Sequence, residues 1–177
     1  MVYAACMRDY LKTVNERVVI FDGGMGATLE AFDLSLEDDY KLPGRAHEAL
    51  ILNRPEVIEG VHRTMVEAGA MVVETDTFQA SRLKLSEWEF ADGTTLAEHT
   101  HEINVKAAQI ARAAVGEDLF VAGSIGPTGM LPASMEPGLC EITFAELAET
   151  FREQTVGLLE GGVDLIIIET AQDILEV

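Results

Sequence analysis

Four short apolar runs set the framework of this sequence. Each run is rich in β-branched residues, is nearly continuous rather than alternating, and ends in a polar or glycine-rich motif. Continuous apolar runs of this length are typical of parallel strands that are covered on both faces. The runs lie at Val18–Asp22, Met71–Thr75, Leu119–Gly123 and Asp164–Thr170.

Helical patterns separate these runs. The first has Asn53 as a predicted N-cap and Pro55 in its first turn. A second covers Thr95–Val115, and a third spans Thr143–Gly161 behind a Thr-x-x-Glu capping box. The alternation of strands and helices predicts an α/β fold with a parallel sheet.

The polar motifs favour one arrangement of that sheet. In a (β/α) barrel the carboxyl ends of all strands converge on one mouth, whereas an open doubly wound sheet concentrates its ligands at one switch point. A TIM-type (β/α)8 barrel needs about 250 residues, and this chain has 177 residues and four predicted strands. We therefore expect a single domain, residues 1–177, that covers about the first half of such a barrel, with the other half supplied elsewhere.

Charge and cysteine content exclude several classes of partner. The chain has 12 basic and 31 acidic residues, a formal net charge of −19. Such a surface repels phosphate, which argues against nucleic acid and anionic membranes as partners. No apolar run is long enough to span a bilayer. Cys6 and Cys140 lie far apart and in no metal-ligand spacing, which fits a reducing compartment, and we expect a cytoplasmic protein.

The loop Asp-Gly-Gly-Met-Gly-Ala-Thr-Leu-Glu at 22–30 follows the first predicted strand directly. A dinucleotide site is poorly supported because the third glycine of G-x-G-x-x-G is missing. A P-loop is excluded because no Gly-Lys-Ser/Thr follows. A tight turn out of the strand would explain the glycines, but it would not explain the acid at the strand end.

Asp22 and Glu169 both stand at strand ends, so a barrel would point both into its mouth. Two carboxylates beside glycine amides suit an amino acid: the acids bind its ammonium, and the N–H groups of Gly23 and Gly24 bind its carboxylate. An acid/base pair for glycoside cleavage needs the same residue types. The aromatic content of 6% with one tryptophan argues against a sugar site, but residue types alone leave both interpretations open.

The histidines are weaker candidates. His99 and His101 suggest a metal pair, but residues two apart on a helix point to different faces, so a solvated surface is the simpler interpretation. His47 and His62 have no evident partners in the sequence.

Five motifs together resemble the homocysteine S-methyltransferase domain, and most closely the N-terminal module of cobalamin-dependent methionine synthases. The resemblance covers roughly Arg17 to Val177, with the motifs in the family's order and with suitable gaps. The motifs are F-D-G-G-M-G-A-T-L-E, R-P-E-V-I-E-G-V-H, E-A-G-A-M-V-V-E-T-D-T-F, A-G-S-I-G-P-T and E-G-G-V-D-L-I-I-I-E-T-A-Q-D.

The resemblance implies a (β/α)8 barrel in which a zinc-bound homocysteine thiolate accepts a methyl group to form methionine. It assigns the substrate ammonium to Asp22 and Glu169, and the substrate carboxylate to the amides of Gly23 and Gly24. Further candidates for substrate contacts are Asp76, Thr77 and Ser124.

The resemblance also implies that the metal ligands lie elsewhere. The family's zinc ligands are three cysteines that would fall beyond Val177, and Cys6 and Cys140 do not replace them. We therefore expect no catalytic residue and no metal ligand in this chain, and no activity from it alone.

The methyl donor follows from the same resemblance. In the methionine synthase branch methylcobalamin carries the methyl group, and further folate- and cobalamin-binding modules could belong to the same protein. Gly24, Ala27 and Asp76 depart from the patterns D-G-A-M-G-T and E-T-N-T-F of that branch. Two alternatives stay open: a cobalamin-independent enzyme that uses an onium donor, and a non-catalytic half-barrel or amino-acid-binding module.

Overall fold

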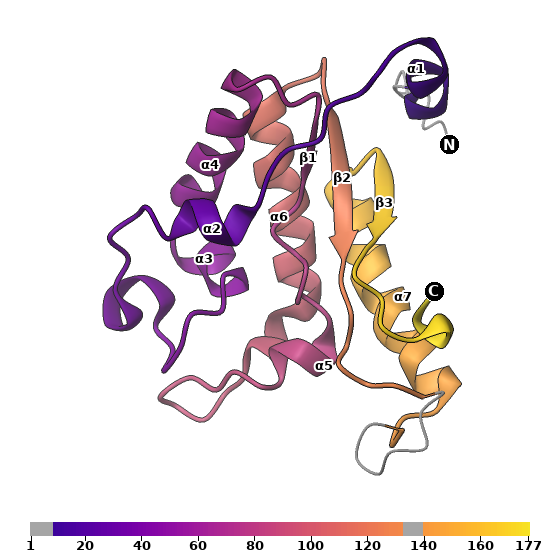
Figure 1. The fold of residues 1–177 in the computed structure, drawn as a ribbon. Coiled ribbons are helices and arrows are strands. Elements are labelled where there is room, and N and C mark those ends of the chain that lie inside the picture. Colours follow the sequence, from indigo (N-terminus) through magenta and orange to yellow (C-terminus); the bar gives the residue numbers. More distant parts are fainter. Residues whose placement is uncertain (1–8, 133–139) are drawn as a thin grey trace, which may run out of the picture.

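A parallel three-stranded sheet forms the centre of the chain. The computed structural model describes residues 9–132 and 140–177. The strands are β1 (Val72–Glu74), β2 (Phe120–Ile125) and β3 (Leu165–Ile168), in the order β1-β2-β3 (Figure 1). The predicted α/β class with a parallel sheet is confirmed.

The first predicted strand, Val18–Asp22, is present only as an extended edge segment. It joins β1 through one parallel bridge, between Phe21 and Val72. The Val72 N–H donates to the Ile20 carbonyl at 3.2 Å, and the Asp22 N–H donates to the Val72 carbonyl at 3.0 Å. Ile20 is 55% exposed, so this segment lacks the cover on both faces that the apolar run predicted. Its last residue is nevertheless fixed beside β1.

Three long helices form one layer against the sheet. They are α4 (Pro55–Glu67), α6 (Thr100–Val115) and α7 (Phe144–Gly161). Helix α6 packs against both α4 and α7, and the layer contacts β1 and β2 (Figure 1). Strands that follow one another in chain order beneath one helical layer suit a (β/α) barrel. Closure into eight strands stays a prediction.

Shorter elements connect this framework. Their bounds are α1 (Tyr10–Glu16), α2 (Met25–Leu29), the π-helical turn η1 (Leu36–Tyr40), α3 (Glu48–Asn53), α5 (Arg82–Leu85) and the 3-10 turns η2 (Leu96–His99) and η3 (Ile174–Glu176).

The predicted N-cap of α4 was wrong. Asn53 is the last residue of α3, and Arg54 occupies the N-cap position before Pro55. The Asn53 side chain instead donates a hydrogen bond to the Tyr40 carbonyl at 3.1 Å. Because only Arg54 separates the two helices, Asn53 lies inside α3 and does not take the N-cap position of α4.

The other two helix starts use capping boxes. Thr143 and Glu146 cap α7 as predicted, and the helix ends at Gly161. The predicted helix over Thr95–Val115 begins instead as the 3-10 turn η2, which has its own capping box with Glu98, and continues as α6.

Apolar side chains pack on both faces of the sheet. The larger cluster lies with the helical layer. On the other face Val72, Phe120 and Ala122 are buried together with Phe21 and Tyr10. The Tyr10 ring meets Phe120 edge-on at a centroid distance of 5.5 Å and Phe21 at 6.3 Å. Helix α1 therefore covers the amino ends of the strands and leaves the carboxyl ends clear (Figure 1).

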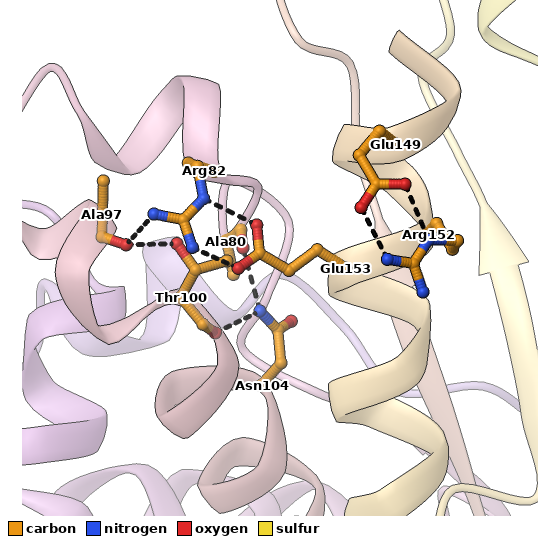
Figure 2. A network of polar contacts seen from close by, with 8 residues as sticks. All are labelled: Ala80, Arg82, Ala97, Thr100, Asn104, Glu149, Arg152 and Glu153. Atoms are coloured by element: carbon orange, nitrogen blue, oxygen red, sulfur yellow. Dashed lines mark hydrogen bonds and ion pairs between the residues drawn. The ribbon is translucent and has the colours of Figure 1, made fainter. Parts of the chain in front are cut away.

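Polar contacts fasten the segment after β1 to α6 and α7. Asn104 of α6 donates to the Ala80 carbonyl at 2.9 Å and to the Thr100 carbonyl at 2.8 Å. Arg82 forms an ion pair with Glu153 of α7 (Figure 2). Because this segment carries the polar residues that follow β1, the contacts fix their position.

Helices α6 and α7 approach closely at a glycine. A Cβ added to Gly161 would lie 2.6 Å from the Ala108 Cβ and 2.6 Å from the Val105 carbonyl oxygen. The backbone oxygen cannot move without shifting the helix.

We predict that Gly161→Ala lowers the free energy of unfolding by about 1–3 kcal/mol. This clash outweighs the gain of about 1 kcal/mol that alanine brings to a helix. The matched control is Gly60→Ala in α4, where an added Cβ meets no atom within 4 Å, and we expect it to stabilise by about 0.4–1 kcal/mol. Urea unfolding of both variants measures the difference; equal effects would contradict the packing described.

Candidate functional site

A cavity of about 540 Å³ lies at the carboxyl ends of the strands. Its lining includes Asp22–Gly24 at and after the end of the edge segment, Glu74–Asp76 at and after the end of β1, Ser124 of β2, and Glu169–Thr170 after β3. The loop before α3 and the first residue of that helix add Arg45–Glu48. Segments far apart in the chain therefore meet at one place.

Six of the seven sequence-predicted contact residues line this cavity. The exception is Thr77, which is fully buried. Its hydroxyl donates to the Ser124 carbonyl at 2.7 Å, and Gln154 of α7 donates to the Thr77 carbonyl at 2.8 Å. Thr77 thus joins the cavity wall to the helical layer. The six lining residues are Asp22, Gly23, Gly24, Asp76, Ser124 and Glu169.

Three carboxyl groups at the carboxyl ends of the strands form an acid cluster, consisting of Asp22, Glu74 and Glu169. Asp22 Oδ2 accepts the backbone N–H of Glu74 at 3.0 Å. The Glu74 carboxyl lies beside the carboxyl of Glu169, close enough for a hydrogen bond when one of the two carries a proton. Glu169 Oε1 accepts the hydroxyl of Ser124 at 2.6 Å. The three acids are therefore held side by side at the strand ends.

Burial and mutual repulsion disfavour the charged forms of this cluster. Burial raises the pKa of Asp22 to about 6, although the N–H of Glu74 opposes the shift. Burial, together with the charges of Glu169 and Asp22, raises the pKa of Glu74 to about 7. A cluster with such pKa values gains stability from any proton or cation that it binds.

A second acid pair, Glu48 and Asp76, lies deeper in the cavity wall. Glu48 Oε1 accepts the Gln79 N–H at 2.9 Å, whereas Asp76 Oδ2 has no hydrogen-bond partner among the residues that the structure describes. Burial, and secondly the charge of Glu48, raises the pKa of Asp76 well above its usual range. The surroundings of Asp76 therefore disfavour its charged form.

Four titratable or charged lining residues were not predicted as site residues from the sequence: Glu74, Arg45, His47 and Glu48. Glu74 closes an apolar run, as Asp22 does, so the strand-end argument applied to every acid would have found it. The other three lie just before and at the first residue of the short helix α3, in no recognisable motif. His47 reaches the cavity because Gly26 lets it approach: a Cβ on Gly26 would lie 2.8 Å from His47 Cε1.

The remaining histidines do not line the cavity. His99 pairs with Glu102 at 3.0 Å and His101 with Glu160 at 2.8 Å, so each faces a different glutamate. His62 is buried, and burial lowers its pKa to about 4, which keeps it neutral. Within residues 9–132 and 140–177, no group of three or more histidine, cysteine or acidic side chains could hold a metal ion.

The first two glycines of the opening loop are not demanded by the fold. Neither Gly23 nor Gly24 has a positive φ. A Cβ on Gly23 would meet no atom within 4 Å, and one on Gly24 would meet only the Ala27 Cβ at 3.8 Å. The turn itself would therefore accept other residues at both positions. Their bare backbone leaves space at the cavity.

Comparison with known proteins places this α/β domain, with its cavity at the strand ends, in a family. Residues 19–177 match the family described as Homocysteine S-methyltransferase. The chain belongs to the homocysteine S-methyltransferase family. No helix in the described part of the chain is long and apolar enough to cross a membrane.

Relatives include two methionine synthases. The chain is 36% identical over 174 residues to that of Mycobacterium tuberculosis and 33% identical over 174 residues to that of Mycobacterium leprae, in each case over 95% of this chain. It spans only 14% and 13% of the lengths of these relatives.

Solved structures with the same fold include the homocysteine methyltransferase MmuM from Escherichia coli. Its metallated form gives a TM-score of 0.70 at 24% identity, over 93% of this chain and 58% of that one. Its oxidised form gives 0.73 at 23% identity, over 96% and 59%.

Proposed function

We propose that this chain forms the homocysteine-binding part of a methionine synthase, within a (β/α)8 barrel whose remaining strands come from outside these residues. The observation that carries the proposal is the single cavity that unites Asp22 and Glu169 with the amides of Gly23 and Gly24. Family membership and the identity with methionine synthases support the same substrate.

The acid cluster suits the ammonium of homocysteine. Asp22 and Glu169 would accept its N–H groups, and each is already oriented by a contact within the fold. The N–H of Glu74 fixes Asp22, and the hydroxyl of Ser124 fixes Glu169. Acceptors held in place in this way lose little rotamer freedom when a ligand binds.

The opening loop suits the carboxylate of the same amino acid. Since neither packing nor backbone geometry requires Gly23 or Gly24, their role is better explained by a ligand that approaches the bare N–H groups. This accounts for the glycines and for the strand-end acid together, whereas a tight turn accounts for neither.

The described residues do not fit the family's zinc. They contain no group able to hold a metal, and Cys140 is not among the residues that line the cavity. We assign to this chain only the binding and orientation of homocysteine. Zinc, the methyl donor methylcobalamin and any folate- or cobalamin-binding module remain expectations from the family resemblance, held by residues outside the chain described here.

An onium compound is the second candidate for the methyl donor. Asp76 stands where the methionine synthase pattern has an amide, and one of its oxygens is buried without a partner. A cationic donor near this acid would favour its charged form and form a charge pair with it. A donor without a positive charge would form no such charge pair with Asp76.

We predict that Asp22→Asn weakens homocysteine binding more than about tenfold in the full-length protein, because it removes one charge-assisted acceptor of the ammonium. Calorimetric titration measures the affinity. Asp118→Asn, an exposed substitution just before β2 and away from the cavity, is the matched control and should bind normally. Unchanged affinity in the Asp22 variant would contradict the assignment.

We predict that Gly23→Ala separates ligand binding from folding. Its free energy of unfolding should stay within about 0.5 kcal/mol of the original, because the added Cβ meets open space. Homocysteine binding should weaken about tenfold or more, because the methyl group crowds the carboxylate above the N–H groups. Loss of stability with normal binding would instead support the tight-turn interpretation.

A further inference from the structure

The backbone N–H of Glu74 fixes Asp22, but the Glu74 side chain stands in the acid cluster without a role in the binding scheme above. Its side chain lines the cavity between those of Asp22 and Glu169, and it comes from the end of the strand that pairs with the edge segment. Its carboxyl contacts the carboxyl of Glu169 directly. Two ionised carboxylates are acceptors only, so this contact is a hydrogen bond only when one of the two carries a proton.

We propose that Glu74 is a third carboxyl of the ammonium site, that it shares a proton with Glu169 while the site is empty, and that this proton leaves when an ammonium group binds. The inference deepens the proposed function and depends on it. Glu74 acts as a positioning residue: it holds Glu169 in the empty site and adds a negative charge to the occupied one.

The geometry of Glu169 fits this role. One of its oxygens accepts the hydroxyl of Ser124 at 2.6 Å, and the shared proton supplies a second donor to the same carboxyl. Glu169 is thus held from two sides before the ligand arrives. An ammonium group brings its own N–H donors and a positive charge, so it replaces the proton as the partner of these acids.

The charges around Glu74 also favour replacement of its proton by an ammonium group. Its pKa is raised to about 7 by burial and by the charges of Glu169 and Asp22. The other titratable or charged side chains that line the cavity are Arg45, His47, Glu48 and Asp76, and neither Arg45 nor His47 contributes to the shifts of Asp22 or Glu74. A cation bound in the cluster therefore lowers the pKa of Glu74 in the complex below its value in the empty site.

The affinity of the site for an ammonium group should depend on pH. Because the complex binds fewer protons than the empty site, affinity for the ammonium rises as pH rises through the pKa of the empty site. If the pKa of Glu74 falls by about two on binding, affinity rises about tenfold between about pH 6 and about pH 8. The raised pKa of Asp22 adds about twofold over the same range.

The test is calorimetric titration of the full-length protein with L-methionine in two buffers of different ionisation enthalpy. Methionine carries the same ammonium and carboxylate as homocysteine but no thiol proton to confuse the count. We expect release of about one proton at about pH 6.5, and less than half a proton from Glu74→Gln. The variant should also keep only about a twofold rise in affinity with pH. Glu67→Gln, an exposed acid on α4, is the matched control and should behave as the original protein does.

The outcomes separate the two proposals. If neither methionine nor homocysteine binds, the proposed function fails and the inference fails with it. If methionine binds with no net proton release, or if Glu74→Gln releases as many protons as the original, only the inference is overturned. Infrared spectroscopy of the original protein gives a check that needs no variant: the carbonyl band of a protonated carboxyl should weaken when methionine binds, and an unchanged band would contradict the proposal.

Discussion

The site depends on acids that parallel strands bring together at their carboxyl ends. Asp22, Glu74 and Glu169 stand at the same edge of the sheet because the edge segment, β1, β2 and β3 run parallel, with β2 between the strands that carry Glu74 and Glu169. Grouping three carboxyls in a partly buried space is unfavourable unless protons, hydrogen-bond donors or a cation offset the charge. The fold supplies the donors through the Glu74 N–H and the Ser124 hydroxyl. These donors do not neutralise all three carboxyl groups, so the cluster favours the binding of a positive charge.

The helical layer keeps this arrangement rigid. The side chains of Asn104 in α6 and Gln154 in α7 donate hydrogen bonds to backbone carbonyl groups of the segment after β1. The Thr77 hydroxyl joins that segment to the Ser124 carbonyl of β2. Each buried donor therefore serves the loop that follows β1 and, through it, the wall of the cavity. Packing of α6 against α7 thus affects the geometry of a site that neither helix forms.

The parallel sheet and the position of the candidate site could be predicted from the sequence. Runs of β-branched residues that end in polar motifs indicate both the strands and the edge of the sheet at which a ligand would bind. Glu74 was overlooked although it ends a run just as Asp22 does. Arg45 and His47 could not be found, because their place depends on how the chain returns to the cavity before α3. Thr77 is a different case: it lies beyond the end of β1, and its hydroxyl bonds to the Ser124 carbonyl, so it supports the cavity wall from behind.

Local signals were less reliable where neighbouring elements compete. Asn53 has the residue type of an N-cap, but the preceding helix α3 extends through it and moves the boundary to Arg54. The run Val18–Asp22 has the composition of a buried strand, yet within the described residues only β1 pairs with it, so little more than one bridge forms. In both cases the neighbouring elements determine the secondary structure, and the intrinsic propensity of the residues is only a weak guide to it.

The most direct measurement of the central claim is a crystal structure of the full-length protein with homocysteine bound. The account predicts the ammonium group within hydrogen-bonding distance of Asp22 and Glu169, and the carboxylate against the N–H groups of Gly23 and Gly24. An amino acid bound in the reverse orientation, with its carboxylate toward Arg45 and no contact to the acid cluster, would contradict it, as would a ligand bound outside this cavity.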